Sequence, residues 1–367
     1  MNEQVLYRKY RPKNFDEIIG QDHVVRAITN AIKLGKVAHA YLFSGPRGTG
    51  KTTVARLIAK ALQCESDNKP CDKCSFCEEF NSGRPMDLIE IDAASNRGIE
   101  EVRELREAVR FAPSRGKYKV YIIDEVHMMT KDAFNALLKT LEEPPEHAVF
   151  ILATTELEKV LPTIVSRTQH YDFKRPTASL IASRLVKLAE KEKFILEDGA
   201  SRMIALAAEG SFRDGESILG QVLITHDDKK ITKEAVEQIL GLPRREAAKE
   251  LFSYLASRDT AASLKLIQRL SDDGYDLNYF NKLMVSFFRN GLFLKTDKSF
   301  KSFLAEEIPL DECEHIESRL VDFSENDLVR GLNLFHEYSQ RFKRSPLPQL
   351  PLELAVIEFI NNKTREV

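Results

Sequence analysis

The sequence predicts an α/β fold built around a parallel sheet, followed by two regions made only of helices. Between residues 39 and 173, short apolar runs alternate with amphipathic helical patterns, which is typical of parallel strands joined by crossover helices. After residue 176 the strand pattern stops and helical periodicity continues alone. The 367 residues are also too many for one ordinary hydrophobic core, so we expect two or three domains.

Five apolar runs are the predicted strands of the sheet. They lie at residues 40–43, 87–91, 119–123, 149–153 and 170–173. Three helices are predicted between them, at residues 52–63, 100–110 and 131–142. The last of these helices has apolar side chains at the i, i+3, i+4, i+7 spacing of one helix face, namely Phe134, Leu137, Leu138 and Leu141. We expect this apolar face to pack in the core.

Helical patterns fill the rest of the chain. Four helices are predicted at residues 178–193, 198–209, 214–224 and 233–240. Gly241 and Pro243 then interrupt the periodicity. Five further helices are predicted at residues 245–257, 261–270, 277–294, 325–342 and 352–361. We therefore expect an α/β domain over residues 1–176, a small helical domain over 177–242 and a larger all-helical domain over 243–367.

The charge balance excludes one way of binding nucleic acid. The chain has 54 basic and 56 acidic side chains and a net charge of −2, so it has no bulk positive potential, and any contact with DNA must be local. No window comes near the roughly 18 uninterrupted apolar residues that a membrane-spanning helix needs, and the first residues lack a basic stretch followed by an apolar one. We expect a cytoplasmic protein without a membrane segment.

A glycine-rich loop follows the first predicted strand and precedes a predicted helix. It matches the pattern G-x-x-x-x-G-K-T and consists of Gly45, Pro46, Arg47, Gly48, Thr49, Gly50, Lys51 and Thr52. Glycines let the backbone wrap closely around phosphate groups, and the helix N-terminus adds a favourable dipole. Lys51 should reach the β- and γ-phosphates, and the Thr52 hydroxyl is placed to bind Mg²⁺. The loop and Thr53, the next residue of the helix, therefore predict a nucleotide site.

Two carboxylates end the third predicted strand. Asp124 follows the apolar run at residues 120–123 and is predicted to hold Mg²⁺ through water, and Glu125 to orient or deprotonate the attacking water. Adjacent residues on a strand point in opposite directions, so only a turn at the strand end can bring both side chains to the phosphates. The alternative is a solvated Asp-Glu pair without a catalytic role. His127 lies two residues further on, and we expect it to be a packed polar residue.

Four of the five cysteines lie between residues 64 and 77. Cys64, Cys71, Cys74 and Cys77 form the pattern C-x6-C-x2-C-x2-C between the helix after the glycine-rich loop and the second strand. Four thiolates can close a tetrahedral Zn²⁺ site with no open position, so the predicted metal site is structural. An iron–sulfur cluster and free or disulfide-linked thiols are the alternatives. Cys313 is far away in the sequence, and we expect it to pack as a hydrophobic side chain.

Several motifs together resemble those of a known family. They are Tyr10-Arg11-Pro12, residues 15–21, the loop at 45–52, residues 90–95, residues 124–127, residues 134–145, residues 153–155 and Ser166-Arg167. With these motifs the sequence resembles the gamma/tau subunits of the bacterial DNA polymerase III clamp loader, which are AAA+ ATPases. The resemblance is close over about the first 220 residues, and the remainder matches in length and helical character only.

The resemblance implies an AAA+ P-loop NTPase fold with a parallel sheet, followed by a small helical lid and an all-α collar domain used for oligomerisation. It implies that several copies bind ATP side by side in a ring with other clamp-loader subunits, and that hydrolysis serves to open a sliding clamp and load it onto primer-template DNA. The chain would then be an ATPase within the DNA polymerase III holoenzyme, a DNA-directed DNA polymerase and nucleotidyltransferase, without being the polymerase active site. The family also agrees with zinc at the four clustered cysteines.

Positions that match the family's motifs gain expected roles from the resemblance. Ile18 and Ile19 resemble the apolar segment that encloses the adenine base. Thr154 and Thr155 resemble the sensor that contacts the γ-phosphate or the attacking water. Alternation along a strand puts only one of the two threonines on the correct face, and we favour Thr155.

Two arginines gain roles in the same way. Arg167 resembles the arginine finger that enters a neighbouring subunit's ATP site and acts there in trans. Arg213 resembles a second sensor that reaches from the helical lid into the site of its own subunit. The sequence departs from the family at Gly215-Glu216, where Ala-Leu is typical, and at Gly220, where Asp is common. Because each glycine costs about 1 kcal/mol of helix propensity, we expect a less rigid lid helix.

Two other functions fit part of the sequence. One is a non-catalytic scaffold subunit of the same assembly, which the intact loop at 45–52 and Glu125 argue against. The other is a related AAA+ DNA motor such as a branch-migration helicase, which is not expected to have the four-cysteine insertion. The charged helix at 99–110 interleaves glutamates with its arginines, which favours a solvated face, so DNA binding should depend on the assembly of several subunits.

Overall fold

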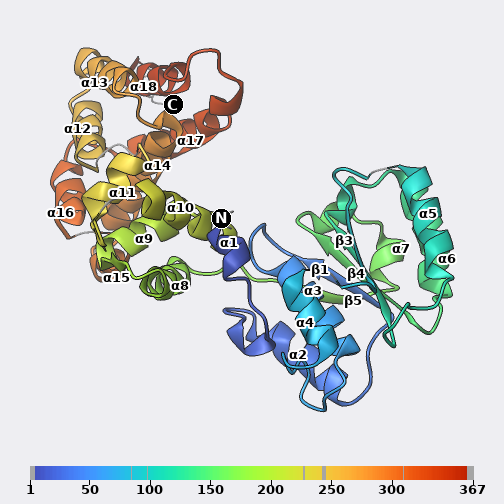
Figure 1. Cartoon of the computed structure of the whole chain (residues 1–367). Helices are drawn as coiled ribbons and strands as arrows, with labels where there is room; N and C mark the ends of the chain where they lie inside the picture. The colour runs from blue at the N-terminus through green and yellow to red at the C-terminus, as the bar shows by residue number, and fades with distance from the viewer. Residues whose placement is uncertain are drawn as a thin grey trace. The chain divides into compact units, whose positions relative to one another are not determined.

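The computed structural model describes residues 5–83, 85–96, 98–225, 228–241, 245–308 and 310–361. The chain divides into two compact units, Met1–Lys233 and Glu234–Val367 (Figure 1). The first unit contains a parallel sheet and helices, and the second contains helices only over the residues described. No helix within these described ranges is long and apolar enough to cross a membrane.

The first unit is built on a five-stranded parallel sheet. Its strands are β1 (Ala40–Ser44), β2 (Leu88–Asp92), β3 (Lys119–Asp124), β4 (Ala148–Thr154) and β5 (Gln169–Asp172), in the order β2-β3-β4-β1-β5. β1 and β4 are neighbouring inner strands that are buried along their full lengths, with Ser44 opposite Thr154. Because all strands run the same way, the ends of β1, β3 and β4 lie along one edge of the sheet. The five predicted strands are confirmed, each bound within one residue of the prediction.

Helices cover both faces of this sheet (Figure 1). They are α2 (Asp22–Lys33) and α3 (Lys51–Gln63) on one face, and α5 (Ile99–Val109), α6 (Lys131–Glu142) and α7 (Pro162–Val165) on the other. Phe43 of β1 packs in the core under α3, whereas its neighbour Leu42 packs in the core under α6. The apolar face predicted on α6 is confirmed, since Phe134 and Leu137 are buried in this second core.

The sequence patterns do not predict several elements of the first unit. These are α1 (Leu6–Lys9), the 3₁₀ turns η1 (Phe15–Glu17), η2 (Val126–Met128) and η3 (Leu157–Lys159), and the helices α2, α4 (Ser75–Ser82) and α7. α2 had a readable signal, because its buried residues Val24 and Ile28 are four positions apart on one face. The others are three to eight residues long, too short for a periodic pattern.

The helical part of the first unit follows the sheet. It contains α8 (Ala178–Lys191), α9 (Asp198–Ala207) and α10 (Phe212–Thr225), and these predicted helices are confirmed. It also contains a parallel pair of short strands, β6 (Ile195–Leu196) and β7 (Lys230–Ile231), so the expectation of helices alone after residue 176 is wrong for this region. Strands of two residues are too short to show an alternating pattern.

α10 is a continuous helix although it contains Gly215 and Gly220. A Cβ on Gly215 would lie 3.1 Å from Ile181 of α8 and 3.2 Å from Ala208, which is tighter than ordinary side-chain packing. A Cβ on Gly220 would lie 3.4 Å from Leu6 of α1. The missing side chain at Gly215 therefore lets α10 pack closely against α8, and this packing offsets the low helix propensity of glycine.

The second unit is a group of helices around α14 (Leu277–Thr296). The others are α11 (Lys233–Ile239), α12 (Arg245–Ala256), α13 (Thr260–Asp272), α15 (Phe300–Glu307), α16 (Leu310–Arg319), α17 (Glu325–Ser339), η4 (Phe342–Arg344) and α18 (Leu350–Asn361). Of these elements, α15, α16 and the 3₁₀ turn η4 are the three that the sequence patterns do not predict. Fully buried phenylalanines, among them Phe252, Phe288 and Phe359, fill the core of this unit. Cys313 is fully buried in the same core, and burial raises its pKa, as expected for a packed side chain.

Candidate nucleotide site and metal centre

The loop at residues 45–52 joins β1 to α3 in a conformation that glycine adopts most easily. Gly45, Gly48 and Gly50 have φ angles of 132°, 74° and 102°. A Cβ on Gly45 would overlap the carbonyl oxygen of Phe173, and one on Gly48 would overlap the side chain of Ser211. α3 begins at Lys51, so its N-terminus opens onto the loop. This is the strand, loop and helix arrangement in which the motif binds phosphate.

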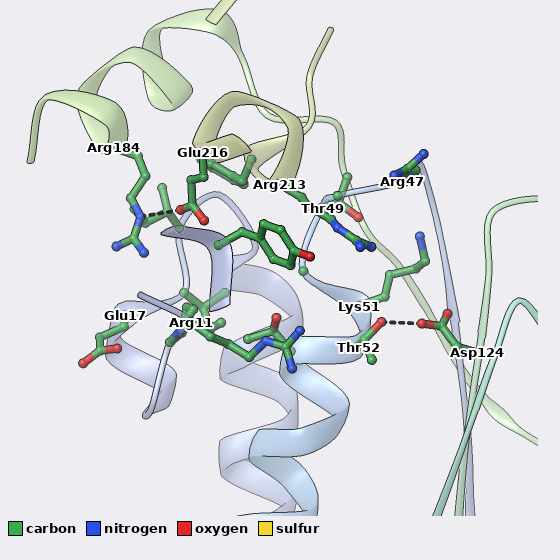
Figure 2. Close-up of a pocket in the computed structure, with 18 of the residues that line it drawn as sticks. Arg11, Glu17, Arg47, Thr49, Lys51, Thr52, Asp124, Arg184, Arg213 and Glu216 are labelled. Atoms are coloured by element: carbon green, nitrogen blue, oxygen red, sulfur yellow. Dashed lines mark hydrogen bonds and ion pairs between the residues drawn. The ribbon is translucent and has the colours of Figure 1, made fainter. Parts of the chain in front are cut away.

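Lys51 is buried in the loop, with 5% of its surface exposed. Its Nζ donates to the carbonyl oxygens of Gly45 and Pro46, at 2.7 and 2.9 Å, and burial lowers its pKa. Thr52 Oγ1 donates to Asp124 Oδ2 at 2.8 Å (Figure 2). A bound phosphate would offer Lys51 a charged acceptor in place of two neutral carbonyls. The oxygens of Thr52 and Asp124 are ligands of the kind that Mg²⁺ requires, so these residues fit a magnesium nucleotide.

Glu125 follows Asp124 in a left-handed backbone conformation, with a φ of 49°. This turn at the end of β3 lets both carboxylates line the same pocket, as their expected roles require. Glu125 Oε2 accepts hydrogen bonds from Thr155 Oγ1 at 2.8 Å and from the Thr155 N–H at 3.2 Å. The Glu125 carboxylate therefore has a defined orientation beside the phosphate loop.

Thr154, at the end of β4, has other hydrogen-bond partners than this carboxylate. It is fully buried, and its Oγ1 lies 2.9 Å from His127 Nδ1 and accepts a hydrogen bond from the N–H of Glu156 at 3.0 Å. His127 Nε2 lies 3.1 Å from Glu156 Oε1, and His127 Nδ1 lies 3.4 Å from Glu125 Oε2. His127 is thus a packed polar residue with partners at both ring nitrogens. Of the two candidate threonines, Thr155 is the one that hydrogen-bonds Glu125.

These elements enclose a pocket of about 290 Å³ in the first unit. Its walls come from the N-terminal residues 7–19, from the loop with the carboxylates that end β3, from Asp92 at the end of β2, and from α8 and α10. Of the residues predicted to bind nucleotide, all except Gly45 and Pro46 line it, including Ile18, Ile19 and Arg213. The Arg213 guanidinium lies 4.8 Å from the centre of the Tyr7 ring and points toward Lys51 in Figure 2.

Eight further pocket residues were not assigned as site residues from the sequence, namely Tyr7, Arg11, Pro12, Glu17, Asp92, Arg184, Phe212 and Glu216. Tyr7 and Arg11 come from the N-terminal segment, Arg184 from α8 and Glu216 from α10. Burial lowers the pKa of Arg11, and the positive charge of Arg56 adds to this effect. Arginines and Lys51 thus concentrate positive charge in the pocket, which favours a polyphosphate ligand. The motif Tyr10-Arg11-Pro12 was the sequence signal that could have identified Arg11, and the departure from the family pattern expected at 216 was the signal for Glu216.

Arg167 lies outside this pocket. It follows α7, and its Nη2 pairs with Glu142 Oε1 at 2.6 Å while its Nη1 donates to the carbonyl oxygen of Thr163 at 2.8 Å. Both charged side chains are partly exposed, and such surface pairs contribute about 0–1 kcal/mol. The Arg167 guanidinium can therefore leave Glu142 at little cost.

The four clustered cysteines bring their sulfur atoms together. All four Sγ atoms lie within 4.8 Å of one another, with Cys64 and Cys77 buried and Cys71 and Cys74 partly buried. A tetrahedral zinc site with Zn–S distances of about 2.3 Å separates its sulfurs by about 3.8 Å. Backbone N–H groups of Lys73 and Cys74 lower the pKa of Cys71 to about 6, which favours the thiolate that binds metal. The four thiols are free of disulfides, and the group fits a structural Zn²⁺.

Lys60 of α3 anchors the cysteine segment. Its side chain is 3% exposed, and its Nζ donates to the Lys13 carbonyl oxygen and to Asn81 Oδ1, both at 2.9 Å, and pairs with Asp72. A buried ammonium is costly unless it is paired in this way. The cysteine segment is therefore joined to the helix that begins at the phosphate loop.

The fold and the pocket define the class of protein. A parallel sheet with a glycine-rich loop after β1, carboxylates after β3 and an arginine from a helical lid is the arrangement of a P-loop ATPase of the AAA+ type. The solved structure of the Thermotoga maritima RuvB Holliday junction branch migration motor is 21% identical, covers 69% of this chain and 80% of its own, and aligns with a TM-score of 0.50. At this identity the likeness shows a shared fold.

Matches to models of protein families identify the family of this chain more specifically than the shared fold does. The model for the DNA polymerase III delta subunit matches residues 20–177, that for the DNA polymerase III clamp loader subunit ATPase lid domain matches 180–227, and that for domain III of DNA polymerase III subunits gamma and tau matches 231–365. DNA polymerase III subunit gamma of Buchnera aphidicola subsp. Schizaphis graminum is 43% identical over 75% of this chain and 76% of its own length. The chain belongs to the DNA polymerase III gamma/tau family, which confirms the resemblance.

Longer relatives extend beyond the matched region. DNA polymerase III subunit tau of Bacillus subtilis strain 168 is 40% identical over 98% of this chain, and the gamma/tau subunit of Mycobacterium tuberculosis H37Rv is 36% identical over 95% of it. The chain spans 63% and 61% of the lengths of these two relatives.

Proposed function

We propose that this chain is the ATPase motor subunit of a DNA polymerase III clamp loader, which binds and hydrolyses ATP to open a sliding clamp and load it onto primer-template DNA. The proposal rests on a complete set of P-loop residues at one sheet edge. Lys51 lies in the loop, Thr52 and Asp124 are joined at 2.8 Å, and Glu125 is oriented by a neighbouring threonine. A non-catalytic scaffold subunit needs none of these contacts.

The pocket residues divide the reaction between binding and hydrolysis. Backbone N–H groups of the loop at 45–52 hold the phosphates, and Lys51 balances their charge. Mg²⁺ held by Thr52 and Asp124 supplies further charge neutralisation when bound. Glu125 orients or deprotonates the attacking water, and Thr155 fixes the position of its carboxylate.

Two arginines act from different directions. Arg213 reaches from α10 into the pocket of its own chain. Arg167 leaves Glu142 to enter the ATP site of a neighbouring subunit, where its guanidinium stabilises charge on the transferring phosphoryl group. The function therefore requires an assembly of other clamp-loader subunits and further copies of this chain. The net charge of −2 fits DNA contact made by such an assembly in the cytoplasm.

Each part of the chain has a role in this proposal. Residues 1–176 bind the nucleotide, residues 177–242 form the lid and residues 243–367 form the collar. The ranges that the family models match support a division near these positions. Zn²⁺ at the four clustered cysteines is structural and has no part in hydrolysis.

ATP turnover by the chain assembled with its partner subunits tests this function. Glu125→Gln keeps the size of the side chain but removes its charge, so turnover should fall about 10²- to 10⁴-fold while ATP binding persists. Glu156→Gln is the matched control, because this neighbouring carboxylate contacts His127 and does not line the pocket. We expect Glu156→Gln to keep near wild-type turnover. Undiminished turnover in Glu125→Gln would refute the catalytic role of Glu125.

A further inference from the structure

A buried ion pair between Arg184 and Glu216 lies in the pocket. Glu216, one turn after Arg213 on α10, is 6% exposed, and its Oε1 accepts a hydrogen bond from Arg184 Nε at 3.0 Å. Arg184 Nη2 also donates to the carbonyl oxygen of Tyr10 at 2.7 Å. The pair therefore joins α8, α10 and the N-terminal segment, and Figure 2 shows it beside the cavity.

Only one of the two oxygens of the Glu216 carboxylate, Oε1, has a hydrogen-bond partner among the described residues. Within the part of the chain that the structure describes, no residue donates a hydrogen bond to Glu216 Oε2. Both Glu216 and Arg184 line the pocket, so a bound molecule can reach this oxygen. A buried carboxylate is costly unless its oxygens are satisfied, and burial raises the pKa of Glu216 in spite of Arg184. Oε2 is not among the buried side-chain atoms that lack a partner in the described chain, so it faces the open pocket, where an N–H or O–H of a ligand can donate to it.

The place of Glu216 along the pocket determines which part of a nucleotide faces it. In Figure 2, Lys51 lies on one side of the cavity, and Arg184 and Glu216 lie on the opposite side. With the phosphates at Lys51, the base would lie toward Arg184 and Glu216. Ile18 and Ile19 line the same pocket. Adenine has an amino group, a donor, at its 6-position. Guanine and hypoxanthine have a carbonyl oxygen, an acceptor, at the same position.

We propose that Glu216 determines the base specificity of this site, with Oε2 accepting a hydrogen bond from the 6-amino group of adenine. The assignment rests on the proposed function, because that function places ATP in this pocket. Arg184 is a positioning residue that fixes the carboxylate through Oε1. A 6-oxo purine would set an acceptor against Oε2 at the 6-position, and its nearest donor, the ring N1–H, lies at a different place on the base; polar sites discriminate by such a mismatch. A leucine at this position would pack against the base without this discrimination.

The isosteric variant Glu216→Gln tests the assignment. Its amide oxygen can still accept from Arg184, and its NH₂ group then faces the base, so the preference should move toward a 6-oxo purine. We expect the wild-type chain to bind ATP about ten- to a hundredfold more tightly than ITP, and Glu216→Gln to lose or invert this ratio. Purine riboside triphosphate, which lacks the 6-amino group, should bind the wild type about tenfold more weakly than ATP, but should bind Glu216→Leu as tightly as ATP does.

Calorimetric titration of the full chain with each nucleotide and Mg²⁺ provides the readout. Glu190→Gln is the matched control, because it makes the same chemical change on the lid helix α8 at an exposed residue that does not line the pocket, and it should keep the wild-type ratio of ATP to ITP affinity. An unchanged ratio in Glu216→Gln would overturn the assignment while leaving ATP binding intact. So would a wild-type chain that loses affinity for dATP and none for purine riboside triphosphate, since that would place the contact at the ribose. A wild-type chain that binds no nucleotide would instead contradict the proposed function.

Discussion

The nucleotide pocket and the cysteine cluster lie in the same unit but are assembled in opposite ways. The pocket takes side chains from segments as far apart in sequence as Tyr7 and Glu216. The cluster takes all of its sulfurs from residues 64–77. The pocket therefore exists only when the sheet, the loop and the lid helices α8 and α10 have folded together, whereas a metal can organise the cluster from one local segment. A distributed site can respond to movement of its segments, and a local site serves stability.

The largest difference between the nucleotide pocket and the cysteine cluster is expected if the pocket is completed by a residue from a second chain. Because Arg167 lies outside its own pocket, Arg167→Ala should leave ATP binding by the isolated chain unchanged. In the assembled complex it should lower turnover about 10³-fold or more at the site that Arg167 enters. Mixed assemblies of Arg167→Ala and Lys51→Ala subunits locate that loss.

The control for this experiment is another surface arginine. Arg202 of α9 pairs with Asp198 and is well exposed, so Arg202→Ala should not change turnover. A loss of turnover confined to the ATP site of the Arg167→Ala subunit itself would rule out action in trans.

Alanine substitutions at two glycines with similar backbone angles should have the next largest effect on ATP binding, and they should affect the nucleotide pocket and the cysteine segment differently. Gly48 has a φ of 74° and lies against Ser211, whereas Gly83 has a φ of 79° at the end of α4, where no atom of the described residues lies within 4 Å of a Cβ position. Either alanine costs about 1–2 kcal/mol of backbone strain. Only Gly48→Ala also pushes the loop away from the lid, so calorimetric titration should show ATP binding weakened by more than about tenfold. Equal ATP affinity in the two variants would show that this close contact does not matter for binding.

Metal removal should have the smallest effect on the pocket. Wild-type chain should contain one Zn²⁺, and Cys77→Ser should lose it, whereas Cys313→Ala should keep it. Loosening of the segment would leave Lys60 without Asp72 and Asn81, and loss of a buried charge's partners costs about 3–5 kcal/mol. Thermal unfolding should therefore shift downward in Cys77→Ser while ATP affinity stays near the wild-type value. Full zinc content in Cys77→Ser would exclude the four-cysteine site.

The parts of the site that follow from a fixed sequence spacing, or from the shared edge of a parallel sheet, could be predicted from the sequence. The loop at 45–52 and the four cysteines have fixed spacings, and the meeting of Thr52 with Asp124 follows from the common edge of a parallel sheet. Arg184 of α8 and Glu216 of α10 are 32 positions apart in the sequence. No spacing rule predicts which side chains of two packed helices will meet. Gly215 shows the same limit, because its sequence context indicates a weakened helix and only the structure shows that a Cβ there would contact Ile181 at 3.1 Å, closer than ordinary packing.

The central claim is that ATP binds in the pocket formed by the loop and the lid helices. Calorimetric titration of the full chain with ATP and Mg²⁺, beside Lys51→Ala, tests it most directly. We predict saturable binding at one site per chain in the wild type and none in Lys51→Ala, with circular dichroism showing the same helix content in both. ATP binding by Lys51→Ala at wild-type affinity would contradict the claim.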